Sequence, residues 1–113
     1  MEYTLKVYET RDGIQPLMDW LRGLRDQKAR IAVRVRLDRM HLGNFGECEP
    51  VGEGVSEMKL HLGPGYRVYF GMIGKTIVLL LCGGAKKSQD KDIRRALEFF
   101  RDHKQREKED GRL

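Results

Sequence analysis

The sequence contains only two cysteines, Cys48 and Cys82, and they form no CxxC pair. Because one lies in a predicted loop and the other in an apolar run, a reduced protein is favoured over a disulfide-stabilised secreted one. The three histidines, at positions 41, 61 and 103, show no metal-ligand spacing with the cysteines. We therefore expect no zinc or other metal site and no cofactor.

A long apolar run is also lacking. The longest, from Ile77 to Cys82, is far too short to cross a bilayer. The first residues, Met1-Glu2-Tyr3, show neither a basic segment nor an apolar core, so no signal peptide is expected. These features predict a cytoplasmic protein that does not associate with a membrane.

Acidic residues are outnumbered by basic ones. The chain has 22 lysines and arginines against 17 aspartates and glutamates, a net charge of +5. A basic protein favours an anionic partner such as nucleic acid, an acidic protein or a membrane surface, and charge alone does not select among them. Its length of 113 residues predicts a single domain over residues 1–113. Residues 101–113 are almost entirely charged, and we expect this tail to fray.

The first half of the sequence predicts one strand and two helices. Residues 3–8 alternate as in a strand. Pro16 suits a first helical turn, and Asp26 can cap a second helix. Basic residues interleave with the apolar residues of the second predicted helix, so the basic face of that helix is either solvated or a docking site for a partner. The two stripes consist of Leu17, Trp20, Leu21 and Leu24, and of Ala29, Val33, Leu37 and Met40 widened by Ile31 and Val35.

The second half predicts a loop, three strands and a helix. Residues 41–54 are rich in glycine and indicate a loop. Gly63-Pro64-Gly65 is expected to form a three-residue turn that pairs Leu62 with Tyr66, Leu60 with Val68, His61 with Arg67 and Lys59 with Tyr69. Residues 76–82 predict a central strand covered on both faces. The last helix carries its apolar stripe on Ile93, Ala96, Leu97 and Phe100.

These elements predict an α+β fold. We expect a small antiparallel sheet with the two N-terminal helices and the C-terminal helix packed on one of its faces.

Polar side chains share one face of the predicted hairpin: Lys59, His61, Arg67 and Tyr69. Opposed residues in a hairpin have Cβ atoms roughly 4.5–5.5 Å apart, so these side chains form a cationic patch. The arginine fork fits phosphate oxygens, and tyrosine can stack on a base. Neighbouring cations should lower the pKa of Lys59 or His61, which would suit proton transfer. Glu57, on the same side, could balance charge or act as a base. The alternative is an ordinary solvent-facing sheet surface.

Residues 83–88, Gly83-Gly84-Ala85-Lys86-Lys87-Ser88, lack the spacing of a nucleotide-binding P-loop. Backbone N–H groups at the start of a helix, together with Lys86 and Lys87, nevertheless attract an anion. A solubilising loop is the alternative interpretation.

Several of these segments together resemble the RelE/HigB type of addiction-module killer protein. The resemblance covers residues 3–100 and is carried by Glu57-Met58-Lys59, Gly65-Tyr66-Arg67-Val68-Tyr69-Phe70, the stretch 78–89, Asp92-Ile93 and Ala96, with the Pro16…Trp20-Leu21 helix and the loop 42–46.

The resemblance implies a RelE-like fold and a toxin of a type II toxin–antitoxin module. Such proteins are usually ribosome-associated, metal-independent mRNA endoribonucleases, in which the RNA 2′-OH attacks the adjacent phosphate. An antitoxin, often a helix-turn-helix protein, silences them. By this resemblance the strand cation of the family falls on Lys59, its hairpin arginine on Arg67 with Tyr69 beside it, and its basic pair on Lys86 and Lys87, so we expect Lys59, Arg67, Lys86 and Lys87 to be catalytic. We further expect His61, Tyr69 and Ser88 to contact RNA, and Arg30 and Arg34 of the basic second helix to contact the antitoxin.

The sequence departs from this family at two places. Ala85 stands where related proteins commonly carry an acid, and Phe99 and Phe100 stand where some members use a tyrosine or an acid. The residues therefore identify no single general base. ParE proteins share the fold but poison gyrase, so a protein-binding toxin remains an alternative, as does a non-catalytic RNA-binding module.

Overall fold

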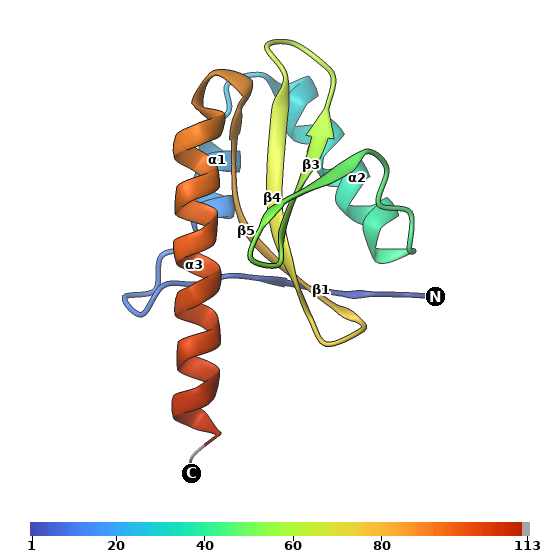
Figure 1. Cartoon of the computed structure of the whole chain (residues 1–113). Helices are drawn as coiled ribbons and strands as arrows, with labels where there is room; N and C mark the ends of the chain where they lie inside the picture. The colour runs from blue at the N-terminus through green and yellow to red at the C-terminus, as the bar shows by residue number, and fades with distance from the viewer. Residues whose placement is uncertain (112–113) are drawn as a thin grey trace.

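The computed structural model describes residues 1–111 and contains one five-stranded sheet with helices on both faces (Figure 1). The strand order in the sheet is β1-β5-β4-β3-β2. The elements are β1 (Thr4–Val7), α1 (Pro16–Gly23), α2 (Gln27–His41), β2 (Cys48–Gly52), β3 (Val55–Leu60), β4 (Tyr66–Ile73), β5 (Ile77–Ala85), the 3₁₀ turn η1 (Lys86–Ser88) and α3 (Gln89–Asp110).

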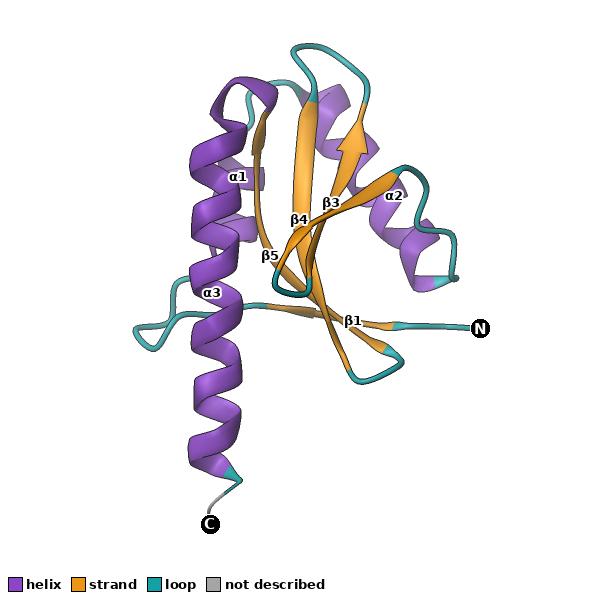
Figure 2. Cartoon of the chain, in the orientation of Figure 1, coloured by secondary structure: helices purple, strands orange, loops and turns teal. Residues whose placement is uncertain are grey.

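The α+β class predicted from the sequence is confirmed, but the sheet is mixed rather than antiparallel (Figure 2). Strand β1 pairs parallel with β5, whereas the other neighbours are antiparallel. The region expected to be a loop, residues 41–54, contains the extra strand β2. This strand lies at the edge of the sheet, where Pro50, which lacks a backbone N–H, is tolerated.

The β3–β4 hairpin has a different register from the predicted one. Lys59 lies opposite Arg67, and Glu57 lies opposite Tyr69, because residues 61–65 form a five-residue connection. Gly65 donates from its backbone N–H to the carbonyl of Leu62 at 2.9 Å, and its φ of 81° suits glycine. The register differs by two residues, so the side chains within the two strands keep their predicted faces although their partners change, whereas His61 and Leu62 lie in the connection rather than in the ladder.

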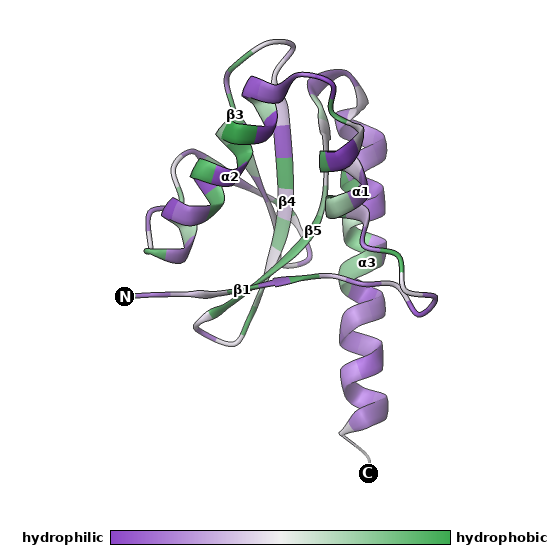
Figure 3. Ribbon diagram, turned by 180° about the vertical axis from the view of Figure 1, so that it is seen from behind, coloured by the Kyte–Doolittle hydropathy of each residue, from purple (hydrophilic) through white to green (hydrophobic). Residues whose placement is uncertain are grey.

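Helices α1 and α2 cover one face of the sheet (Figure 3). Pro16 occupies the first turn of α1, and the carboxylate of Asp26 caps α2 by accepting from the backbone N–H groups of Lys28 and Ala29, as the sequence predicts. Ile31 and Val35, by contrast, are 55% and 40% exposed. The expectation that they widen the buried stripe is wrong, because they lie outside the arc of α2 that contacts the sheet.

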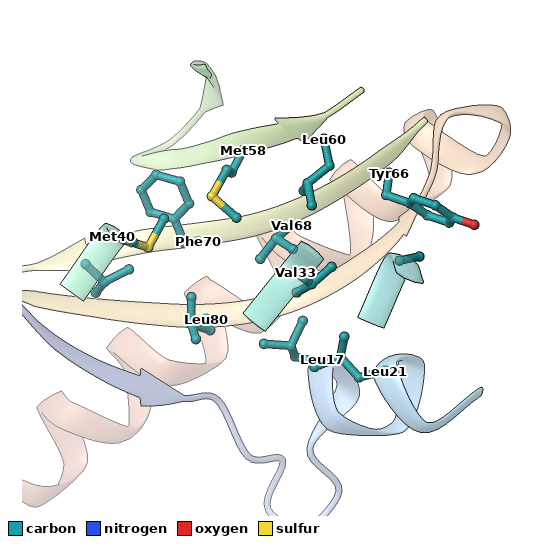
Figure 4. Close-up of a cluster of buried hydrophobic side chains, with 12 residues drawn as sticks. Leu17, Leu21, Val33, Met40, Met58, Leu60, Tyr66, Val68, Phe70 and Leu80 are labelled. Carbon is teal, nitrogen blue, oxygen red and sulfur yellow. The ribbon is translucent and has the colours of Figure 1, made fainter. Parts of the chain in front are cut away.

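A first hydrophobic core fills the space between these helices and the sheet (Figure 4). Alternate residues of the strands point into it, and they meet side chains from both helices. The labelled members are Leu17, Leu21, Val33, Met40, Met58, Leu60, Tyr66, Val68, Phe70 and Leu80.

Helix α3 covers the opposite face and forms a second core, so the expectation of helices on one face only is wrong. The reason lies in β5, the central strand predicted from its apolar run, whose Leu79 and Leu81 face α3. Its other alternate residues face α1 and α2, and a strand that is apolar on both sides needs two covers. Ala96 and Phe100 of α3 are buried on this face.

Helix α3 continues to Asp110, whereas residues 101–113 were expected to fray; residues 112–113 lie outside the described part of the chain. Ion pairs hold this charged half against residues 8–11. The Tyr8 hydroxyl donates to Asp102 at 2.6 Å, and Arg11 lies 3.5 Å from Asp102 and 3.2 Å from Glu109. No helix within residues 1–111 combines the length and apolar character needed to span a membrane.

The close approach of α3 to the sheet predicts that Gly71→Ala destabilises the protein. A Cβ at this position would lie 2.7 Å from the ring of buried Phe100. Overpacking of this kind costs roughly 1–3 kcal/mol, which urea unfolding would measure. Gly23→Ala is the matched control, since nothing lies within 4 Å of its added Cβ. Equal stability of the two variants would contradict this packing.

The Tyr8–Asp102 contact predicts a dependence of stability on pH. Burial raises the pKa of Asp102, but the hydrogen bond from Tyr8 and the charges of Arg106 and Arg11 outweigh it and hold the pKa below its usual value. Its contribution is therefore present above the unfolded pKa of about 3.9 and is lost as the pH falls through the lower folded value.

Asp102→Asn should lower the melting temperature at pH 7 by about 4–8 °C, the effect of roughly 1 kcal/mol in a domain of this size. The difference from wild type should shrink at pH 3, as followed by circular dichroism. A difference that stays constant from pH 7 to pH 3 would refute the assignment.

Candidate nucleic-acid interface

A depression of about 430 Å³ lies at the end of the β3–β4 hairpin, beside the start of η1. The backbone N–H of Lys86 donates to the carbonyl of Gly65 at 2.9 Å, so the hairpin loop and η1 are held together. The lining consists of His61, Leu62, Gly63, Pro64, Gly65, Arg67 and Lys86. The structure thus gathers His61, Arg67 and Lys86, which the sequence analysis singled out, at one place.

Arg67 forms the inner wall of this depression and is almost wholly buried. Its side chain is 8% exposed, and its Nε lies 3.6 Å from a carboxylate oxygen of Glu57. That Nε has no hydrogen-bond partner among the described residues. A buried guanidinium with one edge facing a carboxylate can present its remaining N–H groups to an anion.

Glu57 is buried beneath the patch, at 2% exposure. Gln89, the first residue of α3, donates its side-chain amide to both carboxylate oxygens of Glu57, at 3.1 and 3.0 Å. Of the two roles suggested by the sequence, the structure therefore favours charge balance for Arg67 over a base that reaches a substrate.

Lys59 is paired with acids rather than crowded by cations. Its ammonium lies 2.7 Å from Glu49 and 3.8 Å from Glu47. The hydrogen bond to Glu49, reinforced by the charges of Glu49, Glu47 and Glu57, raises the pKa of Lys59 even though burial opposes it. The expectation of a lowered pKa is wrong for Lys59, because the acids come from the segment that was predicted to be a loop.

His61 is exposed, and its Nε2 lies 3.1 Å from both carboxylate oxygens of Glu47. This hydrogen bond is the main cause that lowers the pKa of Glu47. A histidine oriented by a carboxylate is an arrangement suited to proton transfer.

One of the predicted RNA contacts, Tyr69, lies inside the protein, which contradicts that prediction, whereas Ser88 is half-buried and lines a depression at the start of α3. Tyr69 is 0% exposed beneath α3, where burial raises the pKa of its hydroxyl. A base cannot stack on its ring in this arrangement. The Ser88 hydroxyl lies 2.5 Å from a carboxylate oxygen of Asp92 and 3.1 Å from the carbonyl of Ala85, and so holds the start of α3.

The two lysines of η1 are exposed. Lys86 and Lys87 also border a second depression, of about 370 Å³, at the start of α3 with Lys91 and Arg94. Lys86 lines both depressions, which therefore adjoin. The salt bridges within residues 1–111 include neither lysine. These two charges remain available to an anion.

Arg30 and Arg34, the predicted partner contacts, lie on α2, which packs on the face of the sheet opposite α3 and does not line the depression at the hairpin end. Arg30 is half-buried and donates to the carbonyl of Leu24, whereas Arg34 is exposed. They line a depression of about 310 Å³ together with Met18, Leu21 and Arg22.

The remaining depressions do not bring together the cationic residues singled out from the sequence of the hairpin and η1. A larger depression, of about 630 Å³, lies between the segment 10–20 and α3, with Trp20 and Phe99 in its lining. Within residues 1–111, no three His, Cys, Asp or Glu side chains lie close enough together to bind a metal ion.

Sequence reasoning missed the acids and the amide that surround the cations. Glu47 and Glu49 were hidden in a glycine-rich segment whose strand character is weak, and Gln89 carried no signal of its own. Asp92, in the first turn of α3, is 4% exposed and accepts from Ser88. The alternation of β3 did place Glu57 on the correct face.

The sequence is similar to a protein of Haemophilus influenzae. No family model matches the sequence. The chain is 42% identical over 77 residues to a Haemophilus influenzae protein described only as an uncharacterized protein, an overlap that covers 68% of this chain and 78% of the relative. The chain therefore belongs to the same protein family as this Haemophilus influenzae protein.

Proposed function

We propose that the protein is a metal-independent mRNA endoribonuclease of the RelE/HigB type, the toxin of a type II toxin–antitoxin module. The observation that carries this proposal is the convergence of His61, Arg67 and Lys86 on one depression. An arginine backed by a buried carboxylate, an exposed lysine and an exposed histidine are the groups that hold a phosphate and move a proton. The sequence resemblance supports the same chemistry.

We also propose that the fold is RelE-like. In support, a pair of helices is followed by the antiparallel run β2–β5 and by a C-terminal helix. The helical pair follows β1 rather than starting the chain, and β1 inserts beside β5 at the edge of the sheet.

In the proposed reaction, Arg67 and Lys86 hold the non-bridging oxygens of the scissile phosphate. His61, oriented by Glu47, removes the proton from the RNA 2′-OH, whose oxygen then forms a bond to phosphorus. The bond from phosphorus to the 5′-oxygen breaks, and that oxygen takes a proton from solvent. The products are a 2′,3′-cyclic phosphate and a 5′-OH end.

Lys59 has a different part in this scheme from the one predicted from its sequence context. Because its pKa is raised rather than lowered, the ammonium does not titrate near neutral pH, and it supplies a fixed positive charge next to Glu49. Lys87 lies one residue beyond the depression and contributes charge for the RNA backbone toward the second depression.

The proposed partners are the mRNA on the ribosome and a cognate antitoxin, for which a helix-turn-helix protein is the expectation. The surface on α2 supports antitoxin docking, because Arg34 is exposed beside Ile31 and Val35. An acidic amphipathic segment would match both its charge and its apolar side chains.

The same surface favours a second candidate function, a toxin without nuclease activity that binds a protein target such as gyrase. Exposed apolar side chains at i and i+4 on a basic helix suit a protein partner. RNA ends distinguish the two functions, since only the nuclease creates new ones. A non-catalytic RNA-binding module would bind RNA in a salt-sensitive way without cutting it.

The nuclease proposal predicts that Lys86→Ala and Arg67→Lys reduce cleavage by roughly 10²–10³-fold, the typical cost of losing a group that stabilises transition-state charge. Arg67→Lys keeps the charge but loses the fork. Arg67→Ala is a poorer test, since an unpaired buried Glu57 would cost about 3–5 kcal/mol of stability.

Cleavage would be measured as 2′,3′-cyclic phosphate ends formed on mRNA in translating ribosomes and on free RNA. Lys75→Ala is the matched control, because Lys75 is exposed in the turn between β4 and β5, at the end of β4 opposite to the depression. Intact RNA with the wild-type protein, or equal cleavage by all variants, would reject the nuclease assignment.

The docking proposal predicts that Arg34→Glu prevents neutralisation by the antitoxin. Co-expression with a small helix-turn-helix protein encoded beside this chain should restore growth for the wild type but not for the variant, since the substitution repels an acidic segment. Lys75→Glu carries the same charge change in the exposed β4–β5 turn, outside α2, and should leave neutralisation intact. Restored growth with Arg34→Glu would place the antitoxin elsewhere.

A further inference from the structure

We infer that Glu57 and Gln89 act together as a positioning pair for Arg67, so that the first residue of α3 controls the phosphate-binding arginine. This inference rests on the proposed function of Arg67. It assigns a role to two residues outside the lining of the depression that holds Arg67, although Gln89 lines the second depression at the start of α3.

The strand register places Glu57 and Arg67 together. Lys59 lies opposite Arg67, so Glu57, two residues earlier on β3, is its diagonal neighbour on the α3 face. Glu57 is 2% exposed, and the side chain of Arg67 is 8% exposed. Because a buried charge without a partner costs several kcal/mol of stability, each of the two side chains restricts the position of the other.

Gln89 determines how the carboxylate is oriented. Its amide nitrogen lies 3.1 Å from one carboxylate oxygen and 3.0 Å from the other, so it bridges both. The oxygen that faces Nε of Arg67 at 3.6 Å is one of these two. Rotation of the Glu57 carboxylate would break the bridge, and the guanidinium therefore meets a carboxylate of fixed orientation.

The guanidinium of Arg67 has N–H groups that are not used in hydrogen bonds within the described residues. Its Nε and the neighbouring Tyr69 hydroxyl are buried and lack hydrogen-bond partners among residues 1–111. A purely structural arginine would be expected to satisfy these groups. An arginine held by its charge, with N–H groups still unpaired at the rim beside Gly65 and Lys86, is prepared to bind phosphate oxygens.

The start of α3 links the lysines of η1 to the position of Arg67. Gln89 directly follows η1, which carries Lys86 and Lys87, and Ser88 fixes the same turn by donating toward Asp92. The lysines and the arginine thus depend on one docked turn. Displacement of that turn would separate the groups that hold the phosphate.

Gln89→Met tests the pair, because methionine keeps the length of the side chain but cannot donate to Glu57. Gln105→Met is the matched control, since Gln105 is exposed near the other end of the same helix. We expect kcat for RNA cleavage to fall about 10–100-fold in Gln89→Met with KM changed less than about threefold, because misplacement of a catalytic group acts on kcat. Gln105→Met should match wild type in both constants.

A second readout needs no RNA. The Hε–Nε resonance of Arg67 in a ¹H–¹⁵N spectrum should be protected from solvent exchange in wild type and should exchange at least tenfold faster in Gln89→Met. A stability change alone would lower the melting temperature without altering this resonance below the transition. If Gln89→Met fails to fold, Gln89→Ala, which removes the amide at a half-buried position and leaves the buried Glu57–Arg67 pair intact, should show the same faster exchange.

The two proposals can fail separately. Unchanged kcat and unchanged exchange in Gln89→Met, with wild type active on RNA, would overturn the positioning pair and leave the nuclease assignment intact. Wild type that cuts no RNA but shows faster Arg67 exchange in Gln89→Met would overturn the nuclease assignment and support the pair.

Discussion

Helix α3 lies across the sheet face that carries Glu57, Arg67 and Tyr69, and it buries all three. Charges removed from water need partners, so the contacts beneath the first turn of α3 are constrained more tightly than a hydrophobic contact would be. Gln89 meets Glu57, and Glu57 meets Arg67. The position of one helix turn is thereby coupled to the position of the arginine at the surface depression.

The same burial changes how the basic character of the chain is distributed. Two of the cations on the hairpin face are matched by carboxylates, Lys59 by Glu49 and Arg67 by Glu57, and His61 is hydrogen-bonded to Glu47. The net charge of +5 therefore says little about this patch. A phosphate that enters would compete with the acids, while exposed Lys86 and Lys87 attract it from outside. Such a site would favour a well-positioned phosphate over a loosely held polyanion.

The fold separates two surfaces with different chemistry. The end of the β3–β4 hairpin beside η1 carries His61, Arg67 and Lys86. Helix α2, on the other side of the sheet, exposes the apolar side chains of Ile31 and Val35 beside Arg34. The depression suits an anion, whereas the surface of α2 suits a protein partner with acidic and apolar side chains.

Sequence patterns predicted most of the helices and strands, because these elements depend mainly on interactions between residues close in sequence. Pro16 and Asp26 marked the starts of α1 and α2 correctly, since an N-terminal turn requires only its own neighbours. The hairpin register was wrong by two residues, yet the faces were right, because side chains alternate with a period of two. Strand β2 was missed because its glycines and Pro50 suit a loop and its pairing depends on β3.

The sequence by itself determined the α+β class, the apolar stripes, the central strand β5 and the alternation that puts Glu57, Lys59, Arg67 and Tyr69 on one face. Only the tertiary structure decided which of these side chains stay at the surface. Tyr69 became internal and Lys59 acquired Glu49, because helix docking and the pairing of an edge strand join residues whose separation in sequence carries no local signal. Burial and charge pairing are properties of those long-range contacts, and they determine the chemistry of the site.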